Sequence, residues 1–96
     1  MTLSRKRAAE LLHDTADLID GERAKDYGEP EESFSDISSY WSKYLGVPIS
    51  SFDVGIMMIL MKVARGGRGR FKKDNLVDIC GYAALVGSDD KFNNNS

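Results

Sequence analysis

The chain has 96 residues, of which 42% are hydrophobic and 29% are charged, and its formal net charge is −2. This length supports one small domain, expected over residues 1–88, and excludes a second one, while the composition is that of an ordinary soluble globular protein. Cys80 is the only cysteine, so no intrachain disulfide can form and a cytoplasmic protein is expected.

The first two predicted helices cover residues 4–20 and 31–45. Ser4 is a suitable N-cap for the first helix, and Gly21 is a typical C-terminal stop. A polar connection leads to Pro30, which favours the first turn of the second helix. Each helix has one apolar face. In the second helix this face is formed by Phe34, Ile37, Tyr40, Trp41, Tyr44 and Leu45.

The third predicted helix covers residues 51–65, and Ser50 and Asp53 form a capping box at its start. Its body is apolar on every side, so we expect it to be the buried central helix of a compact, all-α, four-helix domain. The apolar run Val54–Met61 is too short to span a bilayer, and no signal peptide or membrane association is expected.

The fourth predicted helix covers residues 74–86, with Asp74 as its N-cap, and residues 89–96 are expected to be a disordered tail. Asp74, Asp78, Gly81 and Tyr82 fall in one narrow sector of this helix. A glycine inside a helix costs roughly 1 kcal/mol relative to alanine. Gly81 therefore indicates either a harmless gap on a solvated face or a space beside Asp78 for another helix, a base or a phosphate.

Lys62 is the second departure from a simple packing pattern, because it lies on a helix that is expected to be buried. Its ammonium group is expected to reach the surface, or to pair with an aspartate of the fourth helix or with an anionic ligand. Arg65, one turn further on, would complete a two-pronged phosphate clamp. Six basic residues and no acid occur in residues 54–73. This pattern favours a phosphate-binding rim, unless the ten acidic residues in residues 10–36 neutralise it within the fold.

Four spaced elements resemble a family of small phage and prophage proteins of unknown function, which is similar to the nucleotide-modification-associated domains. In order they are "RAKDYGEPEESF", "YWSKYLG", "FDVGIMMILMKVARG" and "KKDNLVDICGYAAL". The resemblance implies a phage-encoded, nucleotide-recognising protein in the cytoplasm of the infected host cell. Phosphates would lie against Arg23, Lys62 and Arg65, with the base near Tyr27 or Tyr82.

A more distant resemblance is to the all-α nucleoside-triphosphate pyrophosphohydrolases, whose acidic helices together hold Mg²⁺. It implies that Glu32 or Asp36, with Asp74 and Asp78, would hold Mg²⁺ or Mn²⁺. Metal-assisted hydrolysis is the only catalytic class that these residues indicate. The acidic residues of the second helix are spaced E-E-x-x-x-D, whereas that family has E-E-x-x-E. Whether the protein is an enzyme therefore stays open. Nucleotide binding does not depend on this metal site.

The alternative is a non-catalytic interaction protein that binds a host factor through its acidic first half or sequesters a nucleotide signal. Lys62 and Asp78 would then form an internal ion pair.

In either case three short amphipathic helices cannot easily cover the third helix and each other. We therefore expect a homodimer or higher homo-oligomer, with aromatic residues of the second helix at its interface. Nucleic acid is not an expected partner, because "GGRGR" occurs once and resembles no phosphate-binding loop.

Overall fold

The computed structural model describes residues 1–67, 69 and 71–93, except for the side chains of Arg23 and Tyr27. Its elements are α1 (Arg5–Asp20), the 3-10 helix η1 (Glu22–Tyr27), α2 (Pro30–Leu45), α3 (Ser51–Gly66), α4 (Lys73–Gly87) and the short α5 (Asp90–Asn93). No strand occurs in this part of the chain. The predicted all-α fold with four long helices is therefore confirmed, and each of these helices begins and ends within one residue of its predicted bounds.

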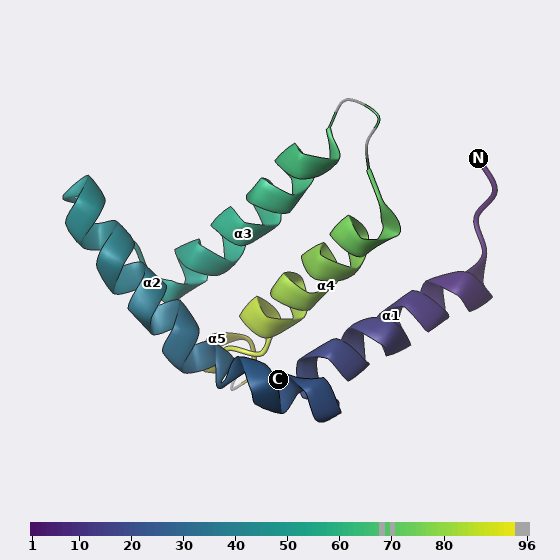
Figure 1. Ribbon diagram of the computed structural model, residues 1–96, viewed down its shortest axis with the longest axis horizontal. Coiled ribbons are helices and arrows are strands. Elements are labelled where there is room, and N and C mark those ends of the chain that lie inside the picture. The colour runs from purple at the N-terminus through teal and green to yellow at the C-terminus, as the bar shows by residue number, and fades with distance from the viewer. Residues whose placement is uncertain (68, 70, 94–96) are drawn as a thin grey trace.

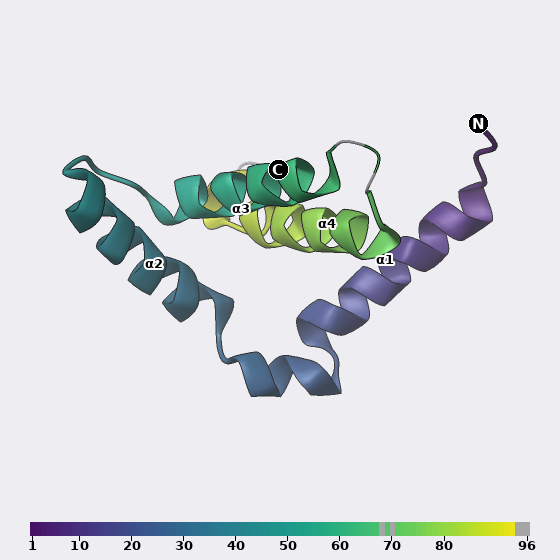
Figure 2. The ribbon, with the colours of Figure 1, turned by 45° about the horizontal axis from the view of Figure 1, so that its top comes forward.

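The antiparallel pair α3 and α4 forms the centre of the fold (Figure 1). Helix α1 packs against α4, and α2 packs against α3. Figure 2 shows α1 and α2 as the two arms of a V that η1 joins at its base, with the α3–α4 hairpin lying across the open side. The polar connection expected between the first two helices is thus mostly the 3-10 helix η1, which the sequence pattern does not predict.

Local capping explains where the helices start and stop. The Ser4 hydroxyl accepts a hydrogen bond from the backbone N–H of Arg7 at 3.2 Å, as expected for an N-cap. At the start of α3 the predicted capping box is present, with both the Ser50 and the Asp53 hydrogen bonds at 3.0 Å. Gly46 ends α2 in the left-handed conformation, with φ 71°.

The start of α4 differs from the prediction, because Asp74 is not its N-cap. The helix begins at Lys73, and Lys72 occupies the N-cap position. The side-chain oxygen of Asn75 accepts a hydrogen bond from the Lys72 backbone N–H at 3.3 Å. Asp74 lies instead in the first turn, where its carboxylate favours the positive end of the helix dipole.

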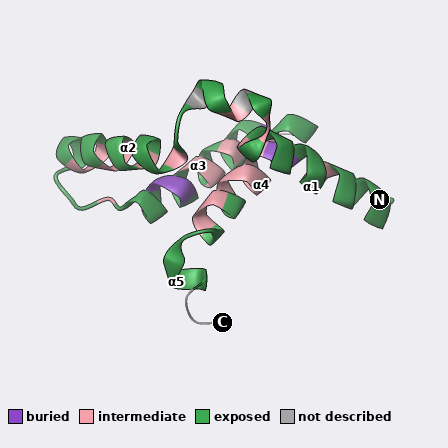
Figure 3. Ribbon diagram, turned by 90° about the horizontal axis from the view of Figure 1, so that it is seen from below, coloured by how far each residue is buried: buried purple, intermediate pink, exposed green. Residues whose placement is uncertain are grey.

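The hydrophobic core is small and lies where the helices cross. Val54 on α3 is completely buried, and Val77 on α4 and Thr15 on α1 are the other buried side chains larger than glycine within the described residues. Figure 3 shows that most of the ribbon is exposed and that the buried positions are few. The buried side chains are therefore shared among α1, α3 and α4 and do not surround the whole of α3.

The third helix is central, as predicted, but within one chain it is not covered on every side. Helices α2 and α4 cover one side of α3, and the remaining side carries large apolar residues that are each at least 36% exposed. We call these residues the outer face of α3: Ile56, Met57, Leu60, Met61 and Val63. The physical reason is that α1 packs on α4 and does not reach this side. None of the described helices is long and apolar enough to cross a membrane.

The accessible surface of the chain is large for its mass. It measures 7870 Å². A globular monomer of 10.7 kDa is expected to expose about 5,500 Å². The chain therefore exposes about 2,400 Å² more than its mass predicts, in agreement with the short list of buried residues.

The segment predicted to be a disordered tail over residues 89–96 begins with the ordered helix α5. Lys91 places its ammonium group 3.8 Å from the centre of the Phe52 ring, and the Phe52 and Phe92 rings lie 6.4 Å apart. These contacts, which the charge-rich sequence does not indicate, hold α5 against the start of α3. Residues 94–96 lie outside the described part of the chain.

Candidate functional site

Lys62 and Asp78 form an ion pair between α3 and α4, as the sequence predicts. The Lys62 Nζ lies 2.8 Å from the Asp78 Oδ2, and it is the only ion pair among the described residues. The two side chains are 16% and 37% exposed, so the pair lies at the edge of the helix interface rather than in open solvent. Lys62 follows Gly55 by two turns of α3, and both residues face α4. The pair thus lies on the same side of α3 as the buried Gly55.

The geometry of this pair limits what it can bind. An ammonium group has three donors, and one of the Lys62 donors points at Asp78. A phosphate could use the remaining donors, or it could displace the carboxylate. Arg65, one turn further along α3, is exposed and is free of any ion pair in the described structure. Lys62 and Arg65 can therefore act together on an anion only at the outer rim of the α3–α4 seam.

The gap at Gly81 is occupied by another helix of the same chain. A Cβ atom on Gly81 would lie 3.8 Å from the methyl group of Thr15 on α1. Thr15 is 3% exposed, and its hydroxyl donates a hydrogen bond to the Leu11 carbonyl at 2.8 Å. Of the three occupants that the sequence left open, a second helix is the one found. No space for a base or a phosphate is needed to account for Gly81.

Tyr82 is also engaged within the chain. Its ring lies 6.3 Å from the Phe34 ring, centre to centre, with the ring planes tilted by 37°. This separation is typical of an aromatic packing pair, and it joins α4 to α2. Tyr82 is half-buried, so its ring is only partly available for stacking on a nucleobase.

The predicted metal ligands are not brought together in one chain. Within the described residues no three His, Cys, Asp or Glu side chains lie close enough to hold one metal ion. Glu32 and Asp36 lie exposed on α2, and Asp74 lies exposed at the start of α4. The reason is that α2 packs mainly on α3, whereas Asp78 of α4 is already paired with Lys62. The predicted ligand residues Arg23 and Tyr27 have side chains outside the described structure.

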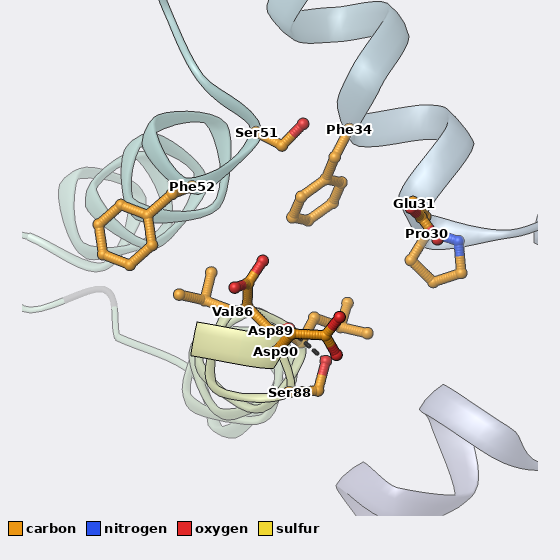
Figure 4. Close-up of a pocket in the computed structure, with 10 residues that line it drawn as sticks. Pro30, Glu31, Phe34, Ser51, Phe52, Val86, Ser88, Asp89 and Asp90 are labelled. Carbon is orange, nitrogen blue, oxygen red and sulfur yellow. Dashed lines mark hydrogen bonds between the residues drawn. The ribbon is translucent and has the colours of Figure 1, made fainter. Parts of the chain in front are cut away.

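A cavity of about 380 Å³ lies at the other end of the hairpin, between the starts of α2 and α3 and the end of α4. Figure 4 shows Phe34 and Phe52 on two sides of it, with Asp89 and Asp90 near the end of α4. It is lined by Pro30, Glu31, Phe34, Ser51, Phe52, Leu85, Val86, Ser88, Asp89 and Asp90. The lining contains three carboxylates and no cation, so it does not suit a phosphate. Sequence reasoning missed this cavity, because its walls come from three segments far apart in the chain.

The α3–α4 hairpin therefore carries opposite charges at its two ends. We call the end near the α3–α4 connection the basic end: Lys62, Arg65, Lys72 and Lys73, together with Asp74 and Asp78. We call the end around the cavity the acidic end: Glu31, Asp53, Asp89 and Asp90, together with Lys91. The 16 residues of α3 separate the two ends by about 24 Å at 1.5 Å per residue.

Comparison with known proteins identifies the relatives of the chain. Residues 10–89 match the family described as a domain of unknown function, DUF6378. Over 76 residues the chain is 45% identical to the Gene 55 protein of Mycobacterium phage D29, in an alignment that covers 79% of this chain and 50% of the relative. The Gene 55 protein of Mycobacterium phage L5 is 39% identical over 77 residues, which cover 79% of this chain and 49% of that protein.

The chain thus spans about half the length of these two curated relatives. No solved structure gives a significant match. The resemblance to small phage proteins of unknown function, which the four spaced sequence elements predicted, is confirmed by the family match and by both phage relatives. The chain belongs to the DUF6378 family, and two phage proteins are similar to it over most of its length.

Proposed function

We propose that this protein recognises a phosphorylated nucleoside at the basic end of the α3–α4 hairpin and works as a homo-oligomer in the cytoplasm of the infected cell. The observation that carries the proposal is the concentration of cations there. Residues 62–73 contain six basic residues and no acid. Arg65, Lys72 and Lys73 are all exposed, and Lys62 lies one turn before Arg65 on α3, paired with Asp78 of α4. A phosphate group is the ligand that such a cluster attracts most strongly.

The proposal is one of binding and not of hydrolysis. Two carboxylates on α4, Asp74 and Asp78, are one turn apart, but one chain supplies no third acidic side chain to them in the described structure. The residues present therefore do not fit a protein-held Mg²⁺ or Mn²⁺ site in a single chain, since such ions need several oxygen ligands. The proposal allows a metal ion only where the nucleotide brings it, already bound to its phosphates.

Thermal unfolding with a panel of ligands tests this function. The panel contains deoxynucleoside monophosphates and triphosphates, cyclic dinucleotides and inorganic phosphate, each with and without Mg²⁺ or Mn²⁺. A ligand at 100 times its Kd adds about 2.7 kcal/mol to the free energy of unfolding. For a domain of this size that raises Tm by at least about 10 °C. We expect one nucleotide class to give such a shift.

Charge-neutralising variants make the test specific. Arg65→Gln and Lys73→Gln remove exposed cations from the basic end and should abolish the nucleotide-dependent shift while leaving the Tm of the free protein nearly unchanged. Lys43→Gln removes an exposed cation from the last turn of α2 and should keep the shift. A shift that survives Arg65→Gln and Lys73→Gln together would contradict a site at the basic end.

A second candidate function is a non-catalytic interaction protein, and a specific observation favours it. The two features that most suggested a ligand site on α4 are engaged inside the chain, because Gly81 faces Thr15 and Tyr82 packs on Phe34. The Lys62–Asp78 pair would then serve to set the register of α3 against α4. If no nucleotide in the panel changes Tm, while the double variant Lys62→Met with Asp78→Leu folds normally, this second function is the better one.

A further inference from the structure

We propose that the outer face of α3 is the surface on which a second copy of the chain docks, with the two α3 helices antiparallel about a two-fold axis. The inference rests on the self-association proposed above and adds to it a surface and an orientation. Sequence reasoning expected aromatic residues of α2 at the interface. Phe34, the first of them, is instead packed against Tyr82 and α3 within the chain.

The outer face is an apolar stripe that runs along α3. Its five large apolar side chains recur at helical spacing, and Leu60 near its middle is 59% exposed. A monomeric protein rarely leaves so continuous an apolar strip in water, and such strips mark interaction sites. On α2 the most exposed large residues are Tyr40 and Tyr44, whose hydroxyl groups are well solvated without a partner. The outer face of α3 therefore gains more from being covered.

The excess surface is of the size that a stable dimer requires. Each chain exposes about 2,400 Å² more than a monomer of its mass, so two chains have about 4,800 Å² of excess surface. Obligate homodimers bury about 2,000–5,000 Å² in total. The excess surface, which is spread over the whole chain, is thus large enough to supply a dimer interface.

The charges at the two ends of the hairpin determine the orientation. Helix α3 starts at the acidic end and finishes at the basic end. Parallel α3 helices would place like charges together at both ends, which is unfavourable. An antiparallel pair places the basic end of each copy beside the acidic end of the other.

Oligomeric state is the first test. Size-exclusion chromatography with light scattering should give twice the chain mass of 10.7 kDa. Leu60→Asp should give a folded monomer, because it places a charge in the middle of the outer face. Tyr44→Asp is the matched control, since Tyr44 is 89% exposed on α2 and lies outside the outer face, and this variant should remain a dimer. A wild-type monomer over a wide concentration range would overturn both the dimer and the proposed self-association. A dimer that survives Leu60→Asp would overturn this surface alone.

Cysteine cross-linking tests the orientation. In a Cys80→Ala background, single cysteines are placed at Ile56 and at Val63, which are about 10 Å apart along the helix. A disulfide requires Cα atoms within about 7 Å. In an antiparallel dimer a mixture of the two variants should cross-link, whereas each variant alone should not. Cross-linking of each variant alone would show parallel helices, and no cross-link in any combination would contradict an antiparallel pair centred near Leu60. The nucleotide panel is read independently, so either proposal can fail without the other.

Discussion

Replacing Gly55 with alanine tests how closely α2, α3 and α4 approach at the start of the hairpin. A Cβ atom at this position would collide with a Val86 methyl group of α4 and lie 3.3 Å from the Phe34 ring of α2. Valine is stiff at χ1, and the ring lies on the other side, so neither neighbour moves away without cost. Overpacking of this kind costs about 1–3 kcal/mol, and alanine returns about 1 kcal/mol of helix propensity. The net expectation is a loss of up to about 2 kcal/mol.

Gly81→Ala is the matched control, because Gly81 also lies inside a helix. Its Cβ would meet only the Thr15 methyl group, at the ordinary contact distance of 3.8 Å. We expect this variant to gain about 0.5–1 kcal/mol. Urea unfolding followed by circular dichroism, at one protein concentration, measures both changes. A stabilised Gly55→Ala variant, or a Gly81→Ala variant that loses more than about 1 kcal/mol, would refute the described packing of α4 against its neighbours.

Three other substitutions give defined expectations. Lys62→Met leaves Asp78 without its partner and should lower the free energy of unfolding by about 1–2 kcal/mol. Adding Asp78→Leu in the same chain should restore most of this loss. Additive losses in this double-mutant cycle would contradict coupling between the two residues. Ser42→Ala removes the hydroxyl that accepts from the Ile49 N–H at 2.8 Å and donates to the Ile49 carbonyl at 3.1 Å. Chemical denaturation should show a loss of about 1–2 kcal/mol, and an unchanged midpoint would mean that the α2–α3 connection is held in another way. Ser50→Ala breaks the capping box of α3 and should cost about 1 kcal/mol, whereas Ser39→Ala on the exposed face of α2 should be neutral in the same assay.

The sequence by itself determined the helices and their ends, because these depend on short-range interactions. The capping residues form hydrogen bonds with backbone groups no more than four residues away, as at Ser4, at Ser50 with Asp53, and at Gly46. Their positions in the chain are therefore sufficient to predict the caps. The start of α4 was harder to predict, since Asp74 and Asn75 are both good capping residues and the hydrogen bond of Asn75 is the one that forms. Pairing of Lys62 with an aspartate of α4 was one of the outcomes that the sequence indicated, because a nearby anion stabilises a partly buried ammonium group.

Only the tertiary structure decided what each helix face contacts. Gly81 marks a gap in the sequence of α4, but the crossing angle of α1 determines that Thr15 fills it. The same is true of Tyr82, which could have faced a ligand and instead packs on Phe34. An apolar helix is expected to be buried, yet the chain has too few helices to cover α3, and its outer face stays exposed in one copy. These outcomes depend on how helices far apart in the chain meet in space, and helical periodicity carries no information about that.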